Sequence, residues 1–223
     1  MSAAKSVRTY VNRFLGLGWA RVFLAVGVIF TLLAMASPLW SITADEGGGD
    51  YAVTTFGWTT LTSVSYQGGL WTDTVIQSYT RPNFSAPALA SAMGASYLVM
   101  VVLLVVLVAA FALFSLSWFE RLPGIGLLIV GLIVVVFAFV ALLYSIFAAP
   151  SAAALTPRWS AITGFWGSVV VGGTTFSWGA ALGWWFLLIG VVFGIVGGVW
   201  PFLKSMRQPM VRAPPPREWQ VER

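Results

Sequence analysis

The sequence predicts an all-α membrane bundle of four transmembrane helices that carries a small extracellular antiparallel β-sheet. Three observations predict this fold. The chain of 223 residues is 59% hydrophobic and only 9% charged, whereas a soluble domain has about 25% charged residues. Its charges leave four long uncharged intervals, each with one apolar run near the ~20 residues that a spanning helix needs. Two of the connections between these runs are rich in β-branched and aromatic residues, which favour strands.

The four apolar runs set the boundaries of the expected spans. These spans are about 22–40, 92–119, 124–148 and 181–203. Each run is much longer than a typical buried strand of about 4–8 residues, and none alternates as a barrel strand would. At about 1.5 Å per residue, the second run exceeds the ~30 Å of a hydrocarbon core. We therefore expect that helix to extend on the outer side, starting near residues 85–92.

The distribution of basic residues predicts the orientation. Of the 12 Lys and Arg residues, only Arg81 and Arg158 lie in the loops 41–91 and 149–180. The rest lie on the other side of the predicted membrane: Lys5, Arg8, Arg13, Arg21, Arg121, Lys204, Arg207, Arg212, Arg217 and Arg223. By the positive-inside rule, both termini are cytoplasmic, both loops are extracellular, and the protein is integral to the plasma membrane. The basic side suits anionic lipid headgroups, so we expect membrane lipids and no nucleic acid as partners.

The two ends of the chain flank this four-span domain of residues 22–203. Residues 1–21 place apolar side chains at helical spacing between basic ones, which predicts an amphipathic helix in the inner headgroup zone; an early start of the first span is the alternative. The small residues around 34–36 resemble a signal-peptide cleavage site, but the apolar run continues to Trp40, which favours an uncleaved span. Residues 204–223 form a Pro-rich, basic cytoplasmic tail.

The two outer loops predict two hairpins. Residues 41–50 contain a flexible Gly-rich turn, followed by strands over 51–66 and 69–79 around a turn at 67–69. In the second loop, residues 162–171 and 174–178 are separated by Gly172 and Gly173. A lone hairpin is only marginally stable in water. We therefore expect the two hairpins to merge into one extracellular sheet.

Topology and two short motifs resemble the claudin and peripheral-myelin-protein superfamily of four-span membrane proteins. Pro38-Leu39-Trp40 looks like the Pro-x-Trp that closes the first span in claudins, and Gly69-Leu70-Trp71 looks like their Gly-Leu-Trp motif. Arg81 stands where that family often has an arginine before the second span. The resemblance implies a claudin-like fold with a role in adhesion or barrier assembly.

The chain departs from the family at its cysteine pair. Thr74 occupies the place of the first cysteine, and the chain contains no Cys at all. The spacing between the two motif tryptophans, Trp40 and Trp71, is also longer than is usual in the family. Without the disulfide, the formation of tight-junction strands is not carried over.

Three glycines of the fourth run share one helix face. Gly190, Gly194 and Gly198 recur at every fourth position, a spacing that lets a neighbouring backbone approach closely. We expect this face to pack inside the bundle. A contact with another subunit is the alternative.

The loop tryptophans are candidates for either a core or a docking surface. Trp71, Trp166 and Trp178 are singled out, together with Trp58 and Trp159. Some are expected to form the core of the sheet, and others an exposed surface, because Trp is enriched at interaction hot spots. Asn83 begins an Asn-Phe-Ser glycosylation sequon on the outer side.

Composition narrows the classes of function. The absence of Cys and His excludes disulfides, metal or haem sites that use these ligands, and every triad that needs a thiol or an imidazole. No charged residue lies within the predicted spans, which argues against a pump or an ion-coupled transporter. Asp45, Glu46 and Asp50 read as a solvated acidic loop, with a weak Ca²⁺ site as the alternative. We expect no catalytic residues, no metal, no cofactor and no small-molecule substrate.

The function predicted from sequence is that of a non-catalytic structural or accessory subunit, not an enzyme. It would bind other membrane protein subunits, as a homo- or hetero-oligomer, through the extracellular sheet and the fourth helix. The alternative is a small channel or transporter component that forms a pore as an oligomer.

Overall fold

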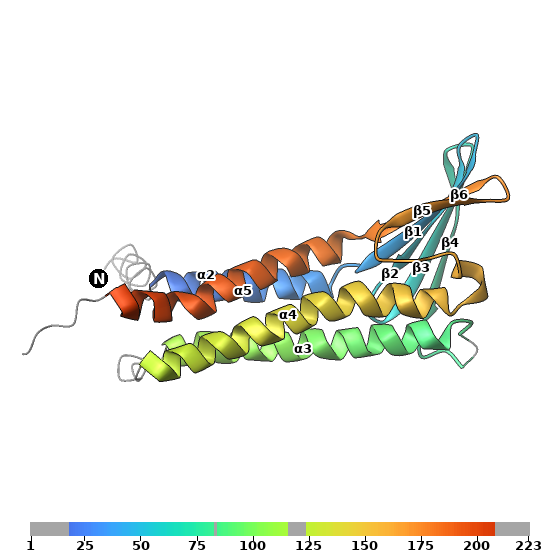
Figure 1. Ribbon diagram of the computed structural model, residues 1–223. Helices are drawn as coiled ribbons and strands as arrows, with labels where there is room; N and C mark the ends of the chain where they lie inside the picture. Colours follow the sequence, from blue (N-terminus) through green and yellow to red (C-terminus); the bar gives the residue numbers. More distant parts are fainter. Residues whose placement is uncertain (1–17, 83, 116–123, 208–223) are drawn as a thin grey trace, which may run out of the picture.

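A computed structural model of the chain describes residues 18–82, 84–115 and 124–207. Within these ranges it contains four α-helices and one six-stranded antiparallel sheet at one end of the bundle (Figure 1). The helices are α2 (Trp19–Met35), α3 (Pro87–Ser115), α4 (Gly124–Ala154) and α5 (Leu182–Arg207). The strands are β1 (Trp40–Gly47), β2 (Asp50–Phe56), β3 (Thr60–Gln67), β4 (Leu70–Ser78), β5 (Gly167–Val171) and β6 (Thr174–Ala180), and a 3-10 turn, η2 (Pro157–Trp159), follows α4. The predictions for residues 1–17, for Asn83 and for the tail from residue 208 lie outside the described residues.

Three helices are long and apolar enough to cross a membrane. They comprise Pro87–Ser115, Ile125–Ala154 and Leu182–Leu203. Helix α2 has 17 residues and rises about 25 Å, which is less than the ~30 Å of hydrocarbon. The described part of the chain is thus a helical bundle joined to an antiparallel sheet. By length and composition, three of its helices could cross a membrane.

The prediction that the first apolar run is helical as far as Trp40 is wrong. Helix α2 ends at Met35, because Pro38 disfavours helical backbone at the residue before it. The chain then turns into the sheet, where the backbone N–H of Leu39 donates to the carbonyl oxygen of Phe56 at 2.8 Å. The last residues of the predicted span therefore belong to the sheet.

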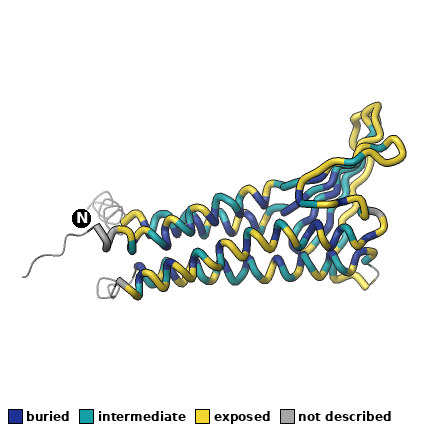
Figure 2. The backbone as a smooth tube through the Cα atoms, in the orientation of Figure 1, coloured by how far each residue is buried: buried dark blue, intermediate teal, exposed yellow. Residues whose placement is uncertain are grey.

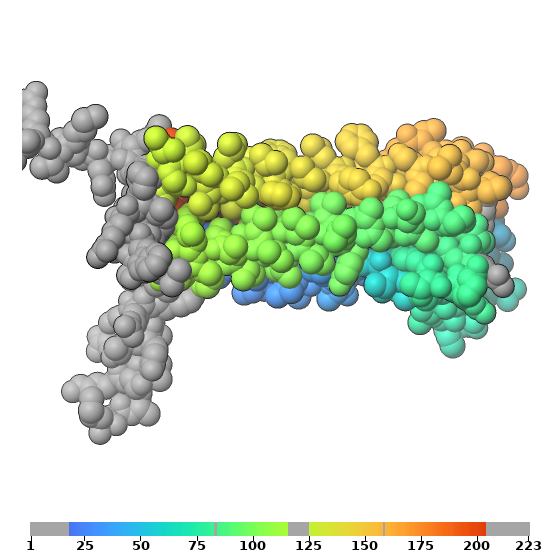
Figure 3. Space-filling model, turned by 90° about the horizontal axis from the view of Figure 1, so that it is seen from below, coloured from blue at the N-terminus to red at the C-terminus, as the bar shows by residue number. Residues whose placement is uncertain are grey.

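Helices α3 and α4 extend well beyond a membrane thickness. They contain 29 and 31 residues and rise about 44 and 46 Å. Helix α3 begins at Pro87, within the range 85–92 that the sequence predicts for its start. Helix α4 continues past the predicted end at residue 148, through Pro150, to Ala154. Figure 3 shows the two helices side by side along one face of the molecule, with the sheet at one end.

The α5 glycines bring the helices into close contact. Helix α2 lies against α5 and α3, and α4 lies against α3 and α5. Gly190 faces Thr31 of α2, Gly194 faces Leu107 of α3, and Gly198 faces Val134 of α4. One glycine face thus serves contacts with three helices of the same chain.

Strands from both loops join into one sheet, as expected. The strand order is β4-β3-β2-β1-β6-β5, so the two loops meet where β1 of the first loop pairs with β6 of the second. Trp40 lies opposite Ala180, and Ile42 opposite Trp178. The sheet continues the bundle at the end where α2 ends and α5 begins (Figure 1).

The first loop differs from the prediction in two details. The Gly-rich turn within residues 41–50 is limited to residues 48–49, and the residues before it form the unpredicted strand β1, Trp40–Gly47, which has partners on both sides, β2 and β6. Residues 51–66 form two strands instead of one. The break occurs at Gly57 and Trp58, where the indole N–H of Trp58 donates to the carbonyl oxygen of Ala34 at 2.7 Å. That bond ties the β2–β3 turn to the end of α2.

Two other indole groups bond the sheet to the segment of the second loop that precedes β5. The N–H of Trp40 donates to the Phe165 carbonyl oxygen, and that of Trp178 to the Gly164 carbonyl oxygen, both at 2.8 Å. Trp40 and Phe56 are fully buried and their rings lie 5.2 Å apart. These buried hydrogen bonds satisfy polar groups that would otherwise be costly. The base of the sheet is therefore bonded to the second loop by Trp40 and Trp178, and to the end of α2 by Trp58.

Candidate functional site

The loop tryptophans divide into a buried and an exposed group. Trp58 and Trp178 are 5% and 7% exposed, and Trp159 is half-buried. Trp71 and Trp166 are 63% and 52% exposed. Trp178 thus belongs to the core, whereas Trp71 and Trp166 remain accessible at opposite sides of the sheet.

Trp166 belongs to an aromatic cluster where β5 begins. Its ring packs edge-on against Phe165 and Trp184, with centroids 4.6 and 5.2 Å away. Trp185 packs edge-on against Trp184 at 5.0 Å. The indole nitrogen of Trp184 is buried without a hydrogen-bond partner among the described residues. The cluster lies at the start of α5, which is where a belt of interfacial aromatic residues would lie.

The edge strand β4 is exposed along almost its whole length. It pairs only with β3, and all its residues except the half-buried Gln77 are exposed. Leu70 and Ile76 are 75% and 65% exposed. Figure 2 shows that the outer tips of the hairpins are exposed as well. The strand therefore offers a free backbone edge together with apolar side chains.

The tips of the two hairpins of the first loop are joined. The N–H of Gly69 donates to the Gly49 carbonyl oxygen at 2.8 Å, and the N–H of Gly68 donates to the Asp50 carboxylate at 2.6 Å. A Cβ at Gly49 would lie 2.8 Å from the Gly69 nitrogen, and its φ is +93°. Glycine is needed here both for the backbone conformation and for the close approach. The start of β4 is thereby fixed against the β1–β2 hairpin.

All carboxylates of the described residues lie on the first-loop strands. They are Asp45, Glu46, Asp50 and Asp73. The six strands contain no Lys or Arg. Within the described residues, no group of three acidic, His or Cys side chains could hold a metal ion. The arrangement is an acidic surface next to the exposed Leu70 and Trp71.

The two family-like motifs lie at different ends of the sheet. Trp40 is buried at its base, whereas Trp71 lies opposite Tyr66, which stacks on Tyr51 with centroids 4.4 Å apart. These aromatic residues lie near the hairpin tips, about 17 Å along β1 from Trp40 at ~3.4 Å per residue. Arg81 is exposed just after β4. The motifs do not form a single site.

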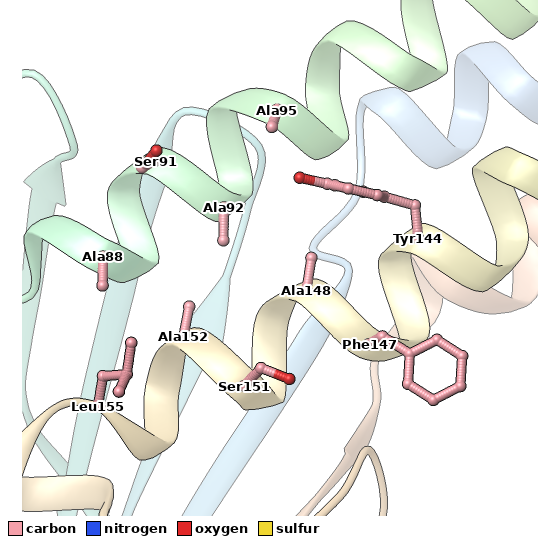
Figure 4. Close-up of a pocket in the computed structure, with 10 residues that line it drawn as sticks. All are labelled: Ala88, Ser91, Ala92, Ala95, Tyr144, Phe147, Ala148, Ser151, Ala152 and Leu155. Carbon is pink, nitrogen blue, oxygen red and sulfur yellow. The ribbon is translucent and has the colours of Figure 1, made fainter.

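A groove of about 580 Å³ separates the sheet-side ends of α3 and α4. Small side chains from the two helices face each other across it, and Tyr144 and Phe147 flank one end (Figure 4). It is lined by Ala88, Ser91, Ala92, Ala95, Tyr144, Phe147, Ala148, Ser151, Ala152 and Leu155. None of these residues is charged, so the groove contains no acid–base pair. Sequence reasoning missed this groove, although the Ala- and Ser-rich ends of the two helices were a signal for it.

Comparisons with known proteins add no family. No protein-family model matches the chain, and no curated protein is significantly similar to it in sequence.

Proposed function

We propose that this protein is a non-catalytic membrane subunit that presents its six-stranded sheet to partner proteins outside the membrane. The observation that carries the proposal is the exposed edge of the sheet on a rigid base. Trp71 and Ile76 are exposed there, while Trp40 and Trp58 bond the base of the same sheet to neighbouring backbone. Rigid, exposed aromatic side chains are typical of interaction hot spots.

The charge distribution supports an orientation with the sheet outside. The start of α2, the end of α3, the start of α4 and the end of α5 lie at one end of the bundle, opposite the sheet (Figure 1). The sheet end carries the described carboxylates, and the other end carries Arg21. The segments that adjoin this end in the sequence, 1–17 and 208–223, contain further Lys and Arg residues. This separation follows the positive-inside rule. In this proposal α2 spans the membrane together with α3, α4 and α5, the location is the plasma membrane, and both termini are cytoplasmic.

The glycine face of α5 has a smaller part in this proposal than the sequence indicated. Gly190, Gly194 and Gly198 are buried against α2, α3 and α4. A partner helix has no access to them in this arrangement. The sheet, and not the fourth helix, is therefore the proposed binding surface.

The resemblance to claudins belongs to the same proposal. Its support is a helical bundle with a sheet at one end, Pro38 and Trp40 at the junction, and Gly69-Leu70-Trp71 at the start of β4. Such a relationship would place the protein in adhesion or in the assembly of a membrane complex.

The test is purification from native membrane in a mild detergent, followed by native mass spectrometry. A partner protein of fixed stoichiometry is the expected result. A homo-oligomer that conducts ions in planar bilayers would overturn the proposal in favour of a channel. A chain that is monomeric, with no companion protein under several mild conditions, would also overturn it.

A further inference from the structure

Strand β4 has only part of the protection that is usual at the edge of a sheet, namely the charge of Asp73 and a register shift beside Thr72. Natural edge strands are short, or carry Lys, Pro or a covering segment. Strand β4 has nine residues, Leu70–Ser78, with neither Lys nor Pro. Both its faces are exposed, since Val75 and Ile76, which are neighbours in the strand and therefore point to opposite faces, are 41% and 65% exposed. The opposite edge, β5, has only five residues. Strand β4 is therefore the longer free edge for the addition of another strand.

The charge around β4 determines what kind of segment would bind. Asp73 lies within the strand, and Asp50 accepts the N–H of Gly68 just before it. The link from Gly69 to Gly49 brings the β1–β2 tip, with its acidic residues, to the same end. With no Lys or Arg in the six strands, this charge is not compensated within the sheet. An approaching segment with positive charge is favoured and one with negative charge is repelled.

Two other occupants fit the same surface less well. An anionic lipid surface carries the same sign of charge as the sheet. A second copy would offer its own β4 or its β5, Gly-Ser-Val-Val-Val, and neither strand contains a basic residue. A basic segment from a different protein satisfies the charge, and an extended segment that alternates basic with apolar residues would place its apolar side chains on the face of Trp71, opposite the face of Asp73.

We propose that β4 binds an extended, basic segment of a partner protein, which pairs with it as a seventh strand of the sheet. The backbone of the partner would supply the hydrogen bonds, and its apolar side chains would pack beside Trp71 and Ile76, which the register places on one face, as in other cases of strand addition. Its basic side chains would lie toward Asp73 and the tip carboxylates. This inference rests on the proposed function, because it names the partner chemistry of the same sheet.

The experiment uses the full chain in zwitterionic lipid nanodiscs and three synthetic probes. The first is an eight-residue peptide of alternating Lys and Val. The second replaces Lys by Glu, and the third carries N-methyl groups at every second residue of the Lys peptide. The Lys peptide is expected to bind, with affinity that falls as salt rises. The Glu peptide is expected not to bind, and N-methylation is expected to weaken binding about tenfold or more, because the backbone hydrogen bonds are lost.

Two substitutions on opposite edges form a matched pair. Ile76 and Val170 are 65% and 67% exposed, on β4 and β5, so Ile76→Lys and Val170→Lys add the same charge without disturbing a core. Ile76→Lys is expected to weaken binding of the Lys peptide about fivefold, the effect of a like charge on a neighbouring strand. Val170→Lys is expected to leave it unchanged. Equal effects of the two variants, or binding unaffected by N-methylation, would overturn the inference.

The outcomes separate the two proposals. If a native partner co-purifies and remains bound to Ile76→Lys, the proposed function stands and the β4 inference fails. If no native partner exists, the proposed function fails, and the inference fails with it. The protein in detergent is also tested for self-association. Self-association that is abolished by Ile76→Lys would overturn the inference, because the occupant of β4 would then be a second copy of the chain.

Discussion

A single methyl group at Gly197 should separate two helices of the bundle. A Cβ at this position would lie 2.8 Å from the backbone nitrogen of Leu24 and 2.9 Å from the carbonyl oxygen of Ala20. Because both atoms belong to the main chain of α2, the helix itself would have to move. Gly94, on α3, is the matched control, since a Cβ there meets no described atom within 4 Å.

The magnitude follows from two opposing terms. Replacing a helical glycine by alanine gains about 1 kcal/mol of helix propensity at either position. Overpacking of a close contact costs about 1–3 kcal/mol, and the upper part of that range applies to Gly197, where backbone atoms obstruct. We expect Gly94→Ala to be stabilised by up to about 1 kcal/mol and Gly197→Ala to be destabilised by about 1–2 kcal/mol.

The assay is reversible unfolding of the purified protein in mild detergent, titrated with a denaturing detergent and monitored by Trp fluorescence. Gly194→Ala is expected to be intermediate in stability between these two variants. The atom nearest to a Cβ added at Gly194 is the Leu107 Cδ2 methyl at 2.8 Å, and a side-chain methyl group moves away more easily than a backbone atom. Equal stability of Gly197→Ala and Gly94→Ala would refute the close packing of α5 on α2.

Three other predictions concern the sheet and its orientation. Gly49→Ala should increase proteolysis at the hairpin tips more than Gly47→Ala does, because both have positive φ but only Gly49 closely approaches another strand. Trp40→Phe should lower the free energy of unfolding by about 1–3 kcal/mol more than Trp184→Phe, because the Trp40 indole N–H makes a hydrogen bond within the described structure and the Trp184 indole N–H does not; equal losses would contradict this. Thr74→Cys, in a chain with no natural Cys, should react with a membrane-impermeant maleimide added to intact cells, and labelling only after lysis would reverse the proposed orientation.

The buried face of the sheet illustrates what local sequence does not contain. Tyr79 follows β4, and its hydroxyl donates to the Gly57 carbonyl oxygen at 2.9 Å. Burial raises its pKa above the ordinary range for tyrosine. No pattern near Tyr79 in the sequence indicates this contact, because the two residues are brought together only by the pairing of β3 with β4.

The sequence by itself determined the presence of long apolar helices, the strand-forming character of both loops and the separation of basic from acidic ends. These properties depend on composition and on spacing within one segment, such as the uncharged run before Glu120. The merging of the two loops into one sheet also followed, because isolated hairpins are only marginally stable.

Only the tertiary structure decided which residues of these segments are available for binding. Trp178 and Trp71 look alike in the sequence, yet one is buried at the β1–β6 pairing and the other is exposed on the edge strand. Likewise, the sequence around Gly194 indicates a helix contact without indicating the partner helix, and in the fold Gly194 packs against Leu107 of α3 in the same chain. The physical reason is that exposure depends on strand order and helix order, which are set by contacts between residues distant in the sequence.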